Sequence, residues 1–233
     1  MEIKLFQTTD TSCGYLEDRI SSSLVVDPEI PLNQELVSWF SCNGFRRSGD
    51  MVYKPTCQHC NACKSCRVRV NEFKASSSQK RIRNKCKIAN SVVREAAFSI
   101  EEYALFEKYI SLRHSDGEMF PPSKDQYQSF LCKNYGFNYF LLTKIDEKII
   151  SVSVFDLLDD GLSAVYTFFD PEFDFLSPGV FSVLKLIDLA KQANLPYVYL
   201  GYWIKDCKKM SYKTKYQPIE IFDRNDWQQY TGN

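Results

Sequence analysis

The sequence predicts a mixed α+β protein with a small cysteine-rich N-terminal domain and a larger C-terminal domain built of α/β layers. Three strand-like segments, a helix and a further strand follow one another between residues 138 and 203, an order typical of a sheet covered by helices. The first part of the chain instead holds four of the nine cysteines within residues 57–66. No Pro/Gly linker separates the two parts, so the expected boundary is a loose one, with domains over residues 1–90 and 91–233.

The N-terminal domain is expected to contain a short strand followed by a helix. Leu24–Val26 is apolar and leads into the turn-forming pair Asp27-Pro28. Apolar residues recur at helical spacing over Gln34–Cys42, and Gly44 is placed to end that helix.

The C-terminal domain is expected to begin with two helices, each opened by a capping-box pattern. One runs over Ser99–Leu112, and the other starts at Ser123 after the break at Pro121-Pro122. The elements that follow are predicted from apolar stretches separated by turn residues. They are the strands Asn138–Lys144, Ile149–Leu157 and Leu162–Phe169, a helix over about Val180–Ala193, and the strand Pro196–Trp203.

This order of strands and helix resembles the acetyltransferase-type (GNAT) fold. In that fold, glycine-rich backbone after the third strand binds the pyrophosphate of coenzyme A at a helix N-terminus. Here the loop over residues 170–179 has one glycine, two prolines and three acidic residues, which suits a pyrophosphate poorly. We therefore expect a GNAT-like acyltransferase domain whose acyl donor is not coenzyme A.

The formal net charge of zero conceals two regions of opposite charge. Twelve Lys or Arg and two acidic residues lie between Asn43 and Lys87, a charge of +10 that the rest of the chain offsets. Clustered cations bind phosphates with release of counterions, and aromatic side chains stack on unpaired bases. The segment therefore indicates RNA or another polyanion as a partner, and a solvated helix face is the alternative. A second cluster places five lysines between residues 205 and 215.

Cys57, Cys60, Cys63 and Cys66 follow one another at intervals of three residues. Thiolates so spaced bind zinc or an iron–sulfur cluster, although four ligands this close reach one ion poorly. Three of them with a remote thiol such as Cys13 would reach more easily, and a metal-free thiol cluster is the alternative. The odd number of cysteines argues against a disulfide framework. With no evident signal peptide and no apolar run long enough to span a membrane, we expect a cytoplasmic protein without a membrane partner.

Motifs spread over nearly the whole chain resemble those of aminoacyl-tRNA–protein transferases, in the same order. They are Cys13-x-Tyr15-Leu16, Gly44-Phe45-Arg46-Arg47-Ser48-Gly49, Tyr53-Lys54-Pro55-x-Cys57-x-x-Cys60-x-Ala62-Cys63, Ser78-Gln79-Lys80-Arg81, Tyr166-Thr167-Phe168-Phe169-Asp170-Pro171, Leu200-Gly201-Tyr202-Trp203 and Cys207-x-x-Met210-x-Tyr212-Lys213-x-x-Tyr216-x-Pro218. The short chain resembles the bacterial aspartate/glutamate leucyltransferase branch. Two residues depart from the family pattern. Cys66 extends the usual run of three cysteines, and Phe169 stands where a tyrosine is common.

The resemblance implies transfer of leucine from leucyl-tRNA to the N-terminal amine of proteins that begin with Asp or Glu. The product would pass to the degradation machinery of the N-end rule pathway, and the chemistry would require no cofactor. Three alternatives stay open: arginyl-tRNA as the donor, a non-enzymatic metal-bearing RNA-binding module, and a thiol redox sensor.

The implied reaction is the attack of an α-amine on an activated ester, so positioning and hydrogen bonding can supply much of the rate. Asp170 is the candidate to accept a proton, although it could equally cap a turn before Pro171. Tyr166 and Tyr202 are candidates to donate to the developing oxyanion or the leaving hydroxyl, with sheet packing as the alternative role.

Cations are needed for the acidic acceptor and for the tRNA, and thiols for any metal. The candidates for the acceptor carboxylate are Arg46, Arg47, Arg113 and His114; those for the tRNA are Lys80, Arg81, Lys209 and Lys213; and those for the metal or cluster are Cys13, Cys57, Cys60 and Cys63. Arg113 also ends a predicted helix, where a cation interacts favourably with the helix dipole.

Overall fold

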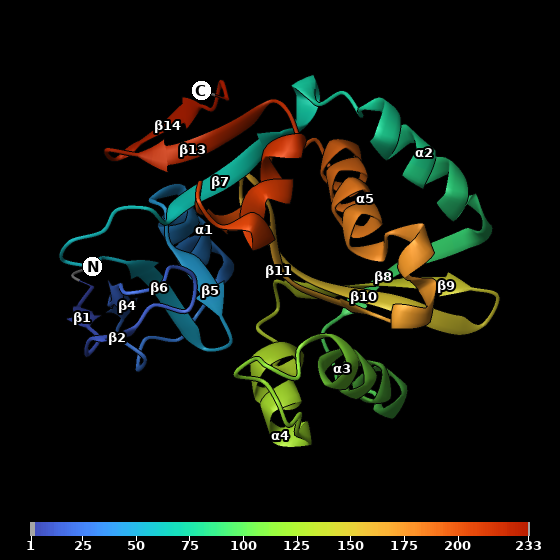
Figure 1. Cartoon of the computed structure of the whole chain (residues 1–233), viewed down its shortest axis with the longest axis horizontal. Helices are drawn as coiled ribbons and strands as arrows, with labels where there is room; N and C mark the ends of the chain where they lie inside the picture. The colour runs from blue at the N-terminus through green and yellow to red at the C-terminus, as the bar shows by residue number, and fades with distance from the viewer. Residues whose placement is uncertain (1–2, 233) are drawn as a thin grey trace.

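The computed structural model describes residues 3–232 and centres on an eight-stranded sheet with the order β14-β13-β7-β12-β11-β10-β9-β8 (Figure 1). Strands β11 and β12 run parallel, and every other neighbouring pair in this sheet is antiparallel. The strands are β7 (Lys64–Arg69), β8 (Ala89–Glu95), β9 (Asn138–Ile145), β10 (Lys148–Leu157), β11 (Gly161–Phe169), β12 (Tyr197–Trp203), β13 (Ile219–Asp223) and β14 (Asp226–Gln229).

Helices cover both faces of this sheet. In Figure 1, α5 (Pro178–Gln192) and α2 (Ser77–Lys85) lie on one side, and α3 (Ile100–Arg113) and α4 (Lys124–Tyr127) lie on the other. Strand β10 is buried on both faces as a result, and its eight residues from 149 to 156 are all buried. The predicted order of three antiparallel strands, a helix and a parallel strand is confirmed as β9, β10, β11, α5 and β12, and so is the mixed α/β class.

A smaller sheet from the N-terminal part packs beside the large one. Its four strands follow the order β1-β4-β6-β5, and a separate two-stranded pair, β2-β3, lies nearby. The elements are β1 (Leu5–Gln7), β2 (Thr11–Ser12), β3 (Ile20–Ser21), β4 (Ser23–Val26), α1 (Gln34–Cys42), β5 (Arg46–Ser48) and β6 (Met51–Pro55). The predicted strand and helix of this part are therefore present. Asn33 caps α1 by accepting the amide of Leu36 at 2.8 Å.

The two parts of the chain share a core and a sheet. Phe40 of α1 packs in one cluster with Phe137, Leu158 and Tyr199 from the C-terminal part. Strand β7, which directly follows the cysteine-rich loop, lies between β12 and β13 in the large sheet. Strand β7 of the N-terminal part is thus a member of the C-terminal sheet. The expected domain boundary near residue 90 stays a prediction.

One predicted helix cap is confirmed and another is wrong in its side-chain detail. Ser123 accepts the amide of Gln126 at 3.2 Å, as the capping pattern predicts. Ser99 occupies the N-cap position of α3, but its side chain makes no cap hydrogen bond. The Glu102 side chain, which would supply the other half of the capping box, is buried and forms an ion pair with Arg94 at 2.5 Å.

The segment after β11 is more regular than expected. It forms the 3-10 helix η4 (Pro171–Leu176), for which Asp170 is the N-cap. Over residues 3–232, no helix is long and apolar enough to cross a membrane.

Candidate active site

The parallel strands β11 and β12 separate at the centre of the large sheet. They pair only through residues 161–163 and 197–199. Just beyond these residues each strand carries a bulge, since Val165 lacks a partner on β10 and Leu200 lacks one on β7. Bulges bend a strand and increase its twist. The two bulges therefore lie where the parallel strands separate and leave an opening between them.

The guanidinium of Arg46 reaches into this opening from the small sheet. Its Nη2 donates to the carbonyl of Val165 at 2.5 Å and to that of Ala164 at 3.3 Å. On the β12 side, Arg46 lies against Gly201, whose φ of +75° is in the left-handed region. Any side chain at Gly201 would collide with the guanidinium. Both strands are therefore shaped to accept Arg46.

We call the cavity at this place the splay pocket. Its volume is about 150 Å³, and it is lined by Tyr15, Arg46, Arg47, Ser48, Tyr53, Phe130, Val165, Tyr166, Tyr202 and Met210. Four residues selected from the sequence as site candidates meet here, namely Arg46, Arg47, Tyr166 and Tyr202. Nε and Nη1 of Arg46 donate no hydrogen bond within residues 3–232, so this cation keeps donors for a ligand.

The two candidate tyrosines differ in how their hydroxyls are used. Burial raises the pKa of Tyr202, and its hydroxyl donates toward the carbonyls of Tyr53 at 2.9 Å and Gly44 at 3.1 Å. Burial also raises the pKa of Tyr166. In the described chain the Tyr166 hydroxyl has no hydrogen-bond partner. Tyr166 is therefore a protonated donor available in the pocket, whereas Tyr202 ties β12 to the small sheet.

Arg47 lines the same pocket but is engaged by other groups. Its Nε and Nη2 donate to the carboxylate of Asp156 at 2.8 and 2.6 Å, and Nη1 donates to the carbonyl of Gly49 at 2.8 Å. Both partners of this ion pair are almost completely buried. The pair links β5 to β10, so a structural role accounts for Arg47.

Asp170 does not line the splay pocket. Its buried carboxylate accepts from Lys108 at 2.7 Å and Lys148 at 2.8 Å, and it also caps the amide of Glu172. Burial alone would raise the pKa of this carboxyl, but the two lysines and the amide hold it below its ordinary value. A carboxylate with three such donors is a weak proton acceptor. The turn-capping role considered for Asp170 is the one its contacts support.

Arg113 and His114 lie at the end of α3, also away from the pocket lining. Arg113 forms a half-exposed ion pair with Asp174 at 3.2 Å. Nε2 of His114 lies 3.1 Å from the hydroxyl of Tyr109, and burial lowers the pKa of His114. The histidine is therefore largely neutral at pH 7.

The sequence matches the model of the C terminus of arginine-tRNA-protein transferase over residues 101–223 and the model of its N terminus over residues 11–81. The chain belongs to the arginine-tRNA-protein transferase family. The predicted family resemblance is thereby confirmed. The matched regions include both Arg46 and the two separating strands, so the splay pocket is formed by the two matched parts of the transferase together.

Curated relatives of this transferase cover almost its full length. An aspartate/glutamate leucyltransferase of Saccharophagus degradans is 46% identical, covering 97% of this chain and 96% of the relative. One from Hahella chejuensis is 43% identical, covering 95% of each. Among solved structures, L-PGS from Bacillus licheniformis is similar with a TM-score of 0.47 and 12% identity, covering 68% of this chain and 47% of that one.

The four candidate tRNA-binding residues divide into three exposed residues and one buried one. Lys80, Arg81 and Lys209 are exposed. Lys213 is only 6% exposed and donates to the carbonyl of Tyr202, and burial lowers its pKa to about 8. A tRNA phosphate cannot reach it there, so its contacts give it a structural role in joining η5 to β12 instead. Its charged neighbours in the sequence predict a surface lysine, but the fold buries it.

The four candidate metal ligands line one small pocket of about 90 Å³ that adjoins the splay pocket through Tyr53 and Tyr202. They are Cys13, Cys57, Cys60 and Cys63. Burial, with the neighbouring thiols, raises the pKa of Cys63 to about 11, so its thiol is protonated at neutral pH.

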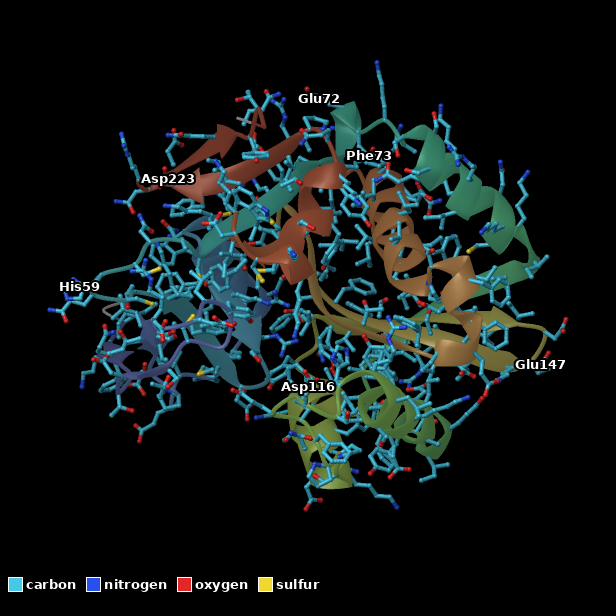
Figure 2. The ribbon with its side chains drawn as sticks, viewed as in Figure 1. His59, Glu72, Phe73, Asp116, Glu147 and Asp223 are labelled. Atoms are coloured by element: carbon cyan, nitrogen blue, oxygen red, sulfur yellow. The ribbon has the colours of Figure 1, made fainter. Side chains whose placement is uncertain are left out.

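Within residues 3–232, no group of three or more His, Cys, Asp or Glu is placed to hold a metal ion. Cys66 is separate from the small cysteine-lined pocket and donates to the carbonyl of Gly201 at 3.2 Å. Figure 2 shows His59 at the outer edge of the N-terminal part, pointing away from the ribbon, and its side chain is exposed.

Sequence reasoning missed Tyr15, Tyr53, Phe130 and Met210 as pocket residues. Tyr15, Tyr53 and Met210 stand in the motifs that resemble the family, and Phe130 lies outside them. Apolar and aromatic side chains are usually core residues, so their presence in a motif did not by itself predict a pocket. Gly201 did carry a signal, because a glycine inside an otherwise apolar strand often marks a bulge or a close approach.

Proposed function

We propose that this transferase moves leucine from leucyl-tRNA to the N-terminal α-amine of proteins that begin with Asp or Glu. The observation that carries the proposal is that Nε and Nη1 of Arg46 are without a partner among residues 3–232, in a pocket with the free hydroxyl of Tyr166. The names of the relatives, aspartate/glutamate leucyltransferase, support the same donor and the same acceptors.

In the proposed reaction, Nε and Nη1 of Arg46 hold the acidic side chain of the acceptor. A charge-assisted hydrogen bond of this kind is about twice as strong as a neutral one, which favours Asp or Glu over uncharged residues. The α-amine attacks the ester carbonyl of the donor, forming a C–N bond as the C–O bond to the ribose breaks. About a tenth of an α-amine is neutral at pH 7, so it needs little help to react.

The hydroxyl of Tyr166 donates a hydrogen bond to the developing oxyanion or to the leaving ribose oxygen. The ribose oxygen finally takes up a proton, and the attacking amine loses one. Tyr202 keeps the wall of the pocket in place through its bonds to the small sheet. The general base is not assigned to Asp170, because two lysines already hold its carboxylate.

The body of the tRNA is proposed to bind the exposed cations of α2 and of η5 (Lys208–Lys215). These two basic clusters lie together, because Gln79 of α2 donates to the carbonyl of Lys215 at 3.1 Å. Lys80 and Arg81 on α2 and Lys209 on η5 are exposed, and we propose that they contribute to the basic surface that binds the tRNA. Such a surface binds phosphates with a strong dependence on salt.

Cytoplasmic residence and delivery of the product to the degradation machinery accompany this proposal, because charged tRNA and acceptor proteins meet there.

Zinc or an iron–sulfur cluster at Cys13, Cys57, Cys60 and Cys63 remains a prediction. The donor set suits a soft metal. The thiols of the described residues are not placed as a metal site, and Cys63 would have to lose its proton to bind. No step of the proposed reaction is therefore assigned to a metal. Metal analysis of anaerobically purified protein tests the prediction, and a folded protein without bound metal would reject it.

The decisive experiment offers radiolabelled leucyl-tRNA or arginyl-tRNA with peptides that begin with Asp, Glu or Ala. Leucine should pass to the Asp and Glu peptides only. Transfer of arginine instead would support the alternative donor, and no transfer by folded protein would overturn the proposal. The variant Arg46→Ala should raise the KM for the acidic peptides, whereas Arg69→Ala, in a partly exposed ion pair with Glu72, should leave it unchanged.

A further inference from the structure

The lining of the splay pocket divides into two chemical groups. Phe130, Val165 and Met210 are apolar, and the other lining residues carry hydroxyl or guanidinium groups. Among residues 3–232, no acidic side chain lines this pocket. A cationic ligand would therefore meet Arg46 without any counter-charge, whereas an aliphatic group could contact the apolar residues.

Phe130 packs against Tyr166 in the lining of the pocket. It lies in the π-helical turn η3 (Gln128–Cys132), directly after α4. Its ring packs edge-on against the ring of Tyr166, with centroids 5.5 Å apart. It also lies near Gly49, since a Cβ added at that glycine would lie 3.9 Å from the Phe130 ring. A side chain positioned by packing can present a defined surface to a ligand.

The size of the pocket sets a limit on what it can take. A volume of about 150 Å³ corresponds to roughly five waters, at about 30 Å³ for each. This is room for a leucyl side chain of four heavy atoms, and the pocket is open to solvent on one side, from which the acceptor and the ester would reach Arg46 and Tyr166. An arginyl side chain in its place would bring an unpaired cation beside Arg46, and a buried unpaired charge is costly.

We infer that Phe130, with Val165 and Met210, forms the subsite for the side chain of the donor amino acid and selects leucine by its size and lack of charge. This inference rests on the proposed function, because it concerns the donor of that reaction. It assigns Phe130 as the residue that decides which aminoacyl group is accepted, a role that no motif in the sequence indicated.

The test compares one tRNA body charged separately with leucine, phenylalanine or arginine, using the full chain and an Asp-initiated peptide. Phe130→Ala enlarges the subsite. The preference for the leucyl over the phenylalanyl donor, measured as a ratio of kcat/KM values, should then fall at least about tenfold. A change of one methylene already gives about 10–200-fold discrimination. Phe130→Asp supplies a carboxylate, so the arginyl-to-leucyl ratio should rise by a similar factor.

Phe175→Ala and Phe175→Asp are the matched controls, because this ring in η4 is 65% exposed and does not line the pocket. Their donor ratios should equal those of the unmodified protein. A ratio taken within one preparation does not depend on how much of it is folded. If the Phe130 variants lower transfer from all donors equally, Phe130 is structural and the inference is overturned. If the unmodified protein transfers no leucine, the proposed function itself has failed.

Discussion

Replacing Gly201 by alanine tests whether Arg46 depends on the bare backbone of β12. Two costs are expected. The first is conformational, since Gly201 has a φ of +75° and an L-residue there costs about 1–2 kcal/mol. The second arises because the new Cβ displaces the guanidinium, which then loses its bonds to the carbonyls of Ala164 and Val165. Hydrogen bonds from a charged group contribute about 1.5–3 kcal/mol.

Gly136→Ala is the matched control. Gly136 has a φ of +81°, yet a Cβ there would meet no atom within 4 Å. The free energy of unfolding of Gly136→Ala should therefore fall only by the conformational cost of about 1–2 kcal/mol.

Two assays separate the costs. Urea unfolding of both variants should give a further loss of about 1.5–3 kcal/mol in Gly201→Ala. Leucyl transfer to an Asp-initiated peptide should fall by about 10²-fold in Gly201→Ala, since a misplacement near 1 Å has this effect, and should be retained in Gly136→Ala. Equal unfolding free energies in the two variants, together with normal transfer by Gly201→Ala, would refute the account of Arg46.

Three more predictions follow from buried and exposed cations. Arg47→Ala leaves Asp156 buried without its partner, so the free energy of unfolding in urea should fall by about 3–5 kcal/mol; a change below 1 kcal/mol would contradict the structural role. Lys213 has a pKa of about 8, below its unfolded value, so the unfolded chain holds more protons from pH 8 to 10.5 and stability should rise with pH there. Relative to Lys213→Met, the gain should reach up to about 3 kcal/mol across that range, and parallel pH profiles would reject it. In salt titrations, Lys80→Ala and Lys209→Ala should each reduce the slope of tRNA binding by about one, and unchanged slopes would remove these residues from the tRNA surface.

Strands β9 to β12 and helices α3 and α5 could be predicted because each has a local signal, whereas β8, β13 and β14 were not predicted. The strand segments from Asn138 to Phe169 are bounded by turn residues, and the helix before β12 has a regular apolar spacing. The half of the capping box that Glu102 would supply at Ser99 is lost for a non-local reason, because Glu102 pairs with Arg94 on a different element.

The candidate site was only half predictable for the same reason. The role of Arg46 depends on carbonyls 118 and 119 residues away in the chain, which no local pattern reveals. Asp170 and Lys213 were selected for their chemistry, but tertiary contacts determine that one is neutralised by lysines and the other is buried. Burial of a polar residue is decided by the fold around it rather than by its neighbours in sequence.

The position of β7 has a consequence for how the molecule is made. This strand is complete at residue 69, but it is paired on one side with β12 and on the other with β13, which ends at residue 223. During synthesis, β7 must wait for almost the whole chain before its hydrogen bonds to both neighbours can form, and such long-range closures slow folding. The splay pocket can therefore assemble only as a late event, and a nascent or truncated chain lacking β12 has no site with which to modify other proteins.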